Sequence, residues 1–123
     1  MRIGALKLRA QIVCGEELAM GPGKADMLEA IDREGSISAA GRAIGLSYRR
    51  AWMLVDTMNR CWSERLVDTI IGGGRTRGAS VTPAGRAVLT AYRALEDSLA
   101  ATVANAPTTV LETLLLETPH PTN

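Results

Sequence analysis

The sequence is poor in aromatic residues: it has no phenylalanine, two tryptophans and two tyrosines among 123 residues. Its core must therefore be built from aliphatic side chains, and a hydrophobic fraction of 46% is enough for one domain of this length. The sequence contains neither an apolar run of about 18 residues nor the charged-then-apolar pattern of a signal peptide. We therefore expect a cytoplasmic protein with no membrane partner.

Residues that carry catalysis or bind metals are also scarce. The one histidine, His120, is flanked by prolines near the C-terminal end, and Cys14 and Cys61 belong to no CxxC pair. No Cys/His cluster is available for a metal, and no nucleophile has a candidate base. We expect neither an enzyme nor a cofactor. For the cysteines we expect two core residues in a reducing compartment, with a disulfide between them as the alternative.

The charge is unevenly distributed although the net charge is only +1. Residues 1–35 carry five basic and six acidic side chains, and residues 78–123 carry two and four. Residues 42–77 carry seven arginines and three acids, a net +4. A positive field confined to the middle of the chain indicates a local contact with phosphates.

The stretch 36–62, SISAAGRAIGLSYRRAWMLVDTMNRCW, predicts two helices joined by a tight turn. Ser36 or Ser38 can cap the first helix, Gly45 suits a left-handed helix end, and Ser47 can cap the second helix. An apolar stripe on the second helix should pack inward; it comprises Ala51, Leu54, Val55, Met58 and Trp62. The pattern is that of a helix-turn-helix, a DNA-binding motif.

The start of the second helix is the part that reaches base edges in such proteins. Tyr48, Arg49 and Arg50 lie there, off the apolar stripe or at its edge, and arginine can bind guanine bidentately. Backbone phosphates are expected at Ser36, Ser38 and Ser47, where helix N-termini attract anions. Trp52 is expected to be a structural plug rather than a base contact.

A wing is expected directly after this helix. Residues 66–71 are rich in β-branched side chains, the loop 72–78 is Gly-Gly-Gly-Arg-Thr-Arg-Gly, and residues 79–82 return as a second strand. The loop lacks the Gly-Lys-Ser/Thr end of a nucleotide-binding P-loop. Arg75 and Arg77 at its tip are therefore expected on the DNA backbone or in the minor groove.

The flanking segments complete the expected fold. Leu6–Ile12 alternates apolar and polar residues, which predicts a strand that pairs with Leu18–Met20 in an N-terminal ribbon. A helix should run from residues 21–23 to Glu34 and end at Gly35. The fold class is α+β, mainly helical: a winged helix-turn-helix over residues 1–82.

A long helix is expected over residues 83–106, since Thr82-Pro83 is a strong start signal. It would be about 35 Å long, more than the domain can cover. Its near-heptad stripe predicts a homodimer; the residues are Val88, Tyr92, Leu95, Leu99 and Val103. A two-fold dimer would place two recognition helices about one duplex turn apart. Residues 107–123 should form a short amphipathic segment and a disordered tail.

Residues Gly35–Asn59, with Gly-Ser-Ile-Ser, Gly-Leu-Ser-Tyr-Arg-Arg-Ala-Trp and Met-Asn, resemble the DNA-binding domain of ModE-type molybdate-responsive regulators. The resemblance extends over about residues 5–106, through the Gly-Pro-Gly-Lys helix start and the wing, and a looser one to LysR-type winged helices covers Gly35–Asn59. It implies a dimeric winged helix whose DNA-facing start is Ser47–Arg50. ModE proteins continue into molbindin-like domains; since this sequence stops at residue 123, we expect a stand-alone DNA-binding domain.

The function expected from the sequence is that of a sequence-specific transcriptional regulator that binds double-stranded DNA as a homodimer. Two alternatives stay open, a winged-helix protein-interaction module and a sensor of a small oxyanion such as molybdate. Control by an unidentified effector or by a regulatory protein is also compatible with the sequence.

Overall fold

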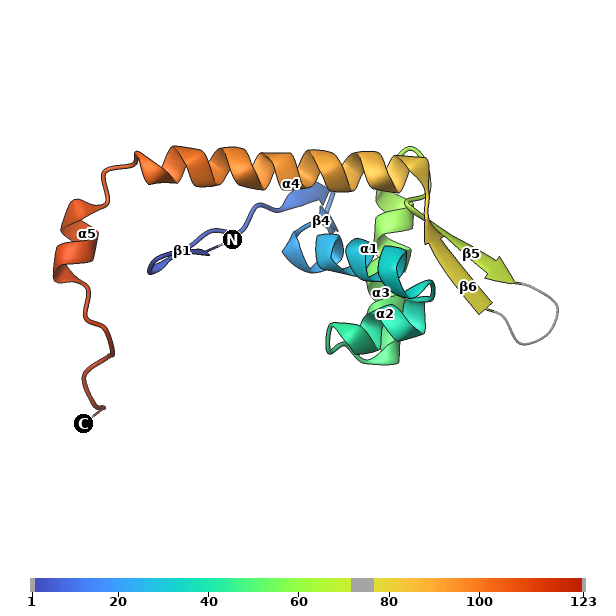
Figure 1. Ribbon diagram of the computed structural model, residues 1–123, viewed down its shortest axis with the longest axis horizontal. Helices are drawn as coiled ribbons and strands as arrows, with labels where there is room; N and C mark the ends of the chain where they lie inside the picture. The colour runs from blue at the N-terminus through green and yellow to red at the C-terminus, as the bar shows by residue number, and fades with distance from the viewer. Residues whose placement is uncertain (1, 72–76, 123) are drawn as a thin grey trace.

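The computed structural model describes residues 2–71 and 77–122 (Figure 1). Its helices are α1 Pro22–Glu34, α2 Ile37–Ala43, α3 Tyr48–Cys61, α4 Pro83–Ala104 and α5 Thr109–Leu114. Its strands are β1 Arg2–Ile3, β2 Leu6–Lys7, β3 Ile12–Cys14, β4 Glu17–Met20, β5 Val67–Ile71 and β6 Arg77–Val81, paired as the antiparallel hairpins β1–β2, β3–β4 and β5–β6. The expected winged helix-turn-helix with an N-terminal ribbon is confirmed.

The core is aliphatic and centres on α1. Met27, Leu28 and Ile31 of this helix are completely buried, and α2 and α3 pack against them. The crossing of α2 and α3 depends on Gly41, because a Cβ atom there would lie 2.7 Å from the Cβ of Ala51. The small residues of α2 therefore bring the two helices of the motif into close contact.

Local signals fix the ends of these helices. The hydroxyls of Ser36 and Ser47 each accept a hydrogen bond of 3.1 Å from a backbone N–H three residues on, at the starts of α2 and α3. Gly35 and Gly45 end α1 and the turn after α2 with φ angles of 76° and 77°, which cost glycine little. The turn between α2 and α3 is therefore fixed by the left-handed conformation of Gly45 on one side and by the Ser47 cap on the other.

Asn59 anchors the wing to α3. Its Oδ1 accepts from the backbone N–H groups of Leu66 at 2.9 Å and Val67 at 3.1 Å, and its Nδ2 donates to the Val67 carbonyl at 3.0 Å. On the other strand of the wing, the Ala79 N–H donates to the Gly35 carbonyl at 2.8 Å. The β5–β6 hairpin is thus fixed to the helices at its base.

Replacing Asn59 with alanine should destabilise the fold by about 2 kcal/mol, because it leaves two N–H groups and a carbonyl in a partly buried place without partners. Chemical denaturation followed by circular dichroism measures this. The matched control is Asn105→Ala, since Asn105 is exposed at the end of α4 and makes one long 3.4 Å bond. Equal stabilities of the two variants would contradict the role given to Asn59.

Two sequence-based predictions about element bounds are wrong. Leu6–Ile12 is not one strand: β2 ends at Lys7 because it pairs back with β1 across a turn at Gly4, whose φ is 57°. The helix α3 ends at Cys61, one residue before the predicted end at Trp62. Trp62 still packs against the core as predicted, and its indole Nε1 donates to the Ala19 carbonyl of β4 at 3.2 Å.

The helix α4 starts at the expected cap, where the Thr82 hydroxyl accepts from the Gly85 N–H at 2.9 Å. Its N-terminal half belongs to the core, and its C-terminal half extends beyond the other helices toward α5 (Figure 1). Tyr92 is 2% exposed and donates its hydroxyl to the Ala10 carbonyl at 2.8 Å. The prediction that Tyr92 is a dimer contact is therefore wrong, and Val88 also packs on the protomer's own core.

The far end of the molecule exposes much apolar surface. Leu95 is 40% exposed, while Leu99 and Val103 are half-buried. On α5, Leu111 and Leu114 are 68% and 76% exposed beside a groove of about 560 Å³ formed with the β1–β2 hairpin. Within the described ranges, no helix has the length and apolar character needed to cross a bilayer.

Candidate nucleic-acid interface

The first turn of α3 presents the side chains expected to read DNA. Ser47, Tyr48, Arg49 and Arg50 are all exposed, and Tyr48 has 63% of its surface accessible. The N-terminal end of α3 lies beside α2, at the end of the helix farther from α4 (Figure 1). The helix N-terminus and two guanidinium groups therefore face solvent together, an arrangement suited to phosphates and base edges.

Several arginines elsewhere in the fold are paired with carboxylates, whereas those of this surface are not paired with any carboxylate of the described residues. Arg60, Arg86 and Arg93 each form an ion pair with a carboxylate at 2.9 Å or less. Among the residues that the structure describes, Arg42, Arg49 and Arg50 form none. Their positive charge is therefore available to an external anion.

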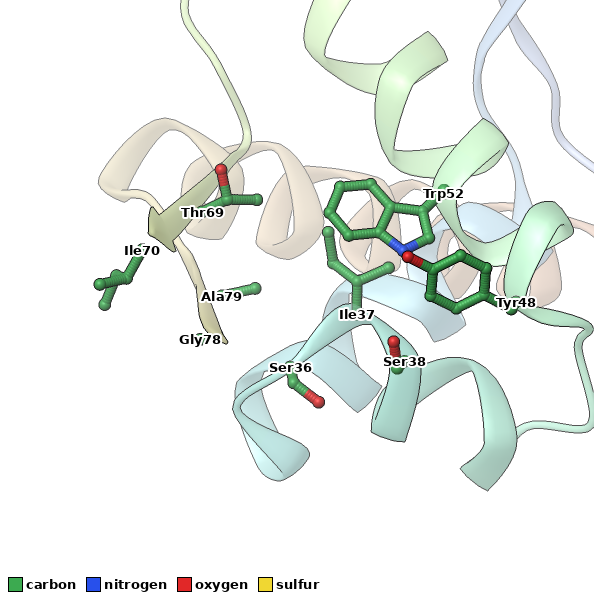
Figure 2. Close-up of a pocket in the computed structure, with 9 residues that line it drawn as sticks. All are labelled: Ser36, Ile37, Ser38, Tyr48, Trp52, Thr69, Ile70, Gly78 and Ala79. Atoms are coloured by element: carbon green, nitrogen blue, oxygen red, sulfur yellow. The ribbon is translucent and has the colours of Figure 1, made fainter. Parts of the chain in front are cut away.

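A cavity of about 460 Å³ lies between this helix start, α2 and the wing (Figure 2). Its lining comprises Ser36, Ile37, Ser38, Tyr48, Trp52, Thr69, Ile70, Gly78 and Ala79. Ser36 and Ser38, both half-buried, bring their hydroxyls from the first turn of α2. The structure thus brings the predicted serines close to Tyr48, although they come from different helices.

Trp52 is not the structural plug expected from the sequence. It is 38% exposed and lies one turn after Tyr48, with the two ring centroids 6.1 Å apart and the planes inclined at 58°. The buried face of α3 is instead occupied by Ala51, Val55 and Met58. Trp52 therefore extends the exposed surface of α3, where an aromatic ring can contact a thymine methyl group or a sugar.

Lys24 was not predicted as a site residue. It is only 7% exposed and lines a cavity of about 260 Å³ together with Arg9 and Arg50. Burial, and then the positive charge of Arg50, lower the pKa of Lys24 below its usual range. The only sequence signal was its place in the Gly-Pro-Gly-Lys start of α1. Lys24 adds positive charge beside the predicted reading end.

The wing arginines are only partly described. Arg75 lies outside the described residues, and Arg77 is the first residue of β6, paired in register with Ile71. The register runs from Val67↔Val81 to Ile71↔Arg77, so Arg77 belongs to a strand and not to the loop predicted to carry both arginines. No group of three or more His, Cys, Asp or Glu side chains that could hold a metal ion occurs in the described part of the chain.

Sequence comparison finds similarity to molybdenum-related regulators, and no protein-family model matches. The chain is 47% identical over 57% of its length to "Molybdenum transport protein ModE" of Azotobacter vinelandii, and 44% identical over 66% to "Molybdenum-pterin-binding protein MopB" of Rhodobacter capsulatus. It is 31% identical over 63% to "DNA-binding transcriptional dual regulator ModE" of Escherichia coli K12. The matches cover only 26%, 30% and 29% of these relatives.

Structural comparison finds similarity to the full-length LTTR LysG of Corynebacterium glutamicum with its effector Arg bound. The TM-score is 0.51 at 28% identity, over 76% of this chain and 30% of LysG. A second structure of full-length LysG gives the same TM-score of 0.51 at 27% identity, over 74% of this chain and 30% of LysG. The chain therefore carries a winged helix-turn-helix that is related in sequence to ModE-type regulators and in fold to LysR-type regulators.

Proposed function

We propose that this chain is a sequence-specific DNA-binding transcriptional regulator that acts as a homodimer. The observation that carries the proposal is the capped, exposed start of α3, where Arg49 and Arg50 have no carboxylate partner among the described residues. A guanidinium without a counter-ion can form a bidentate contact with guanine without first breaking an ion pair. Tyr48, Arg49 and Arg50 are the base-reading residues of this proposal.

The remaining contacts are assigned to the phosphate backbone. Ser36, Ser38 and Ser47 lie at the N-termini of α2 and α3, where backbone N–H groups and the helix dipole favour an anion. Arg75 and Arg77 reach the backbone or the minor groove from the wing. The similarity of this segment to proteins named as transcriptional regulators, one of them as DNA-binding, supports this assignment.

Dimerisation is assigned to the projecting half of α4. The helix has 22 residues and is therefore about 33 Å long. Its core-facing side continues past Tyr92 as Leu95, Leu99 and Val103, and no part of the described protomer buries these three residues fully. The exposed leucines of α5 extend the same apolar end, and apolar patches of this kind mark interaction sites. Pairing of two α4 helices would double the phosphate contacts.

Binding to a DNA duplex is expected to weaken steeply with salt, because each neutralised phosphate releases counter-ions. With five or more phosphates contacted, the plot of log K against log salt should have a slope of roughly −4 or steeper. Fluorescence anisotropy with duplex DNA between low and physiological salt measures the slope. A flat salt dependence would favour the protein-interaction module instead.

Introducing charge among Leu95, Leu99 and Val103, the apolar stripe on the projecting half of α4, should convert the dimer into a monomer. Leu95→Glu with Leu99→Glu places two carboxylates where the partner helix would pack, so the mass in light scattering should fall to that of one chain and DNA binding should weaken at least tenfold. Thr90→Glu is the matched control, since Thr90 is exposed on α4 away from the stripe. A double variant that stays dimeric would place the interface elsewhere.

A further inference from the structure

The two cysteines meet although they are far apart in the sequence. Cys14 ends β3 and Cys61 ends α3, and the Cys14 side chain is close enough to Cys61 to contribute to the raised pKa of its thiol. Neither is in a disulfide. The sequence predicted two core cysteines, but Cys14 is exposed and Cys61 is half-buried. The pair is therefore a contact between two elements at the surface.

Contacts on both sides of the pair fix its geometry. Glu17 lies directly opposite Cys14 in the β3–β4 register, and its Oε1 is 3.7 Å from Nη2 of Arg60. On the other side, Trp62 donates to the Ala19 carbonyl at 3.2 Å. Three consecutive residues, Arg60 to Trp62, thus contact one hairpin, which brings the end of α3 and the end of β3 together.

The two thiols differ in their environments. Burial, and then the neighbouring Cys14 side chain, raise the pKa of Cys61, so this residue stays protonated at neutral pH. Cys14 is exposed, so a small disulfide can reach its sulfur. Cys14 is therefore the residue that reacts first with a disulfide oxidant, and Cys61 is positioned to displace the glutathione from it.

We propose that Cys14 and Cys61 form a reversible disulfide that clasps the β3–β4 hairpin to the end of α3 in the presence of a small oxidised disulfide such as glutathione disulfide. The Cys14 thiolate attacks one glutathione sulfur, giving a mixed disulfide and one glutathione thiolate. The Cys61 thiol then loses its proton to the first glutathione thiolate and attacks the Cys14 sulfur, releasing the second glutathione thiolate, which takes up the proton that Cys14 had released to the solvent. Both cysteines are oxidised, and one glutathione disulfide is reduced to two glutathiones.

The Cys14–Cys61 disulfide would raise the stability of the fold and leave the affinity for DNA nearly unchanged. It closes a long loop across the domain, which restricts the unfolded chain. Cys61 is at the opposite end of α3 from the predicted reading residues, about 20 Å away for a helix of 14 residues. Oxidation should therefore raise the melting temperature by on the order of 10 °C and leave affinity for DNA within about two-fold.

The test treats the full chain with glutathione redox buffers and follows thiols, disulfide pairing and melting. The expected result is that both thiols disappear in a monomeric covalent species, peptide mapping links Cys14 to Cys61, the melting temperature rises, and dithiothreitol reverses all of this. A stable glutathione adduct on Cys14 with Cys61 still free would overturn the proposal, as would disulfides formed only between chains.

Two single variants make the order of events testable. Cys61→Ser should trap the glutathione adduct on Cys14, while Cys14→Ser should leave Cys61 slow to react because it is half-buried and its pKa is raised. Equal melting temperatures of the two variants and the parent chain under reducing conditions would show that each folds. Fast adduct formation at Cys61 in the Cys14→Ser variant contradicts the assigned order.

Discussion

Replacing both Arg49 and Arg50 with alanine is expected to lower affinity for the preferred DNA site at least 100-fold, to the level of non-specific binding. Each bidentate arginine–guanine contact contributes about 1–3 kcal/mol to discrimination. The fold should be unaffected, because both side chains are exposed and without carboxylate partners among the described residues. The Ser47 cap accepts from the backbone N–H at position 50, which alanine keeps.

The measurement begins with selection of a preferred site from random duplexes, followed by anisotropy titrations of that site and of a scrambled duplex. The control is Arg65→Ala, since Arg65 is also exposed, is 3.9 Å from Asp68, and precedes the end of β5 farther from the wing loop. Circular dichroism checks that each variant is folded. If the double variant still prefers the selected site over the scrambled one, these arginines do not read the sequence.

Local signals in the sequence predicted the helix-turn-helix closely. Ser36 and Ser47 form the expected caps, and Gly35 and Gly45 adopt the left-handed conformations expected of them. Each of these features depends on residues within four positions of one another, so the sequence contains nearly all of the relevant chemistry. The exposure of Tyr48, Arg49 and Arg50 followed for the same reason, because a capped helix start fixes which side chains lie off the apolar stripe.

The residues that were missed or misassigned depend on distant partners. Tyr92 has the spacing of a dimer stripe, but its hydroxyl donates a hydrogen bond to the Ala10 carbonyl of the same chain. Helical periodicity does not distinguish burial against the same chain from burial against a partner helix, because the spacing is the same in both. Asn59 is an ordinary polar residue of α3 until β5 folds against it. Trp52 was predicted to be a structural plug, yet it is exposed and its ring lies beside that of Tyr48. Only the arrangement in space distinguishes these outcomes.

Gly85 was not singled out in the sequence, yet it lies at the joint between α4 and the base of the wing. A Cβ atom there would overlap the carbonyl oxygen of Leu66 and would lie 2.7 Å from Cγ1 of Val81. The carbonyl cannot easily move, because it accepts the Thr82 N–H at 3.0 Å. The joint therefore tolerates no side chain without a shift of α4 against β5.

Gly85→Ala should destabilise the protein by about 3 kcal/mol or more, since overpacking against backbone outweighs the higher helix propensity of alanine. The melting temperature should fall by more than about 10 °C. Gly23→Ala is the matched control: Gly23 also lies in the first turn of a helix, α1, and nothing lies within 4 Å of its added Cβ. That variant should be unchanged or stabilised by up to about 1 kcal/mol. Equal melting temperatures for the two variants would show that α4 can shift away from β5.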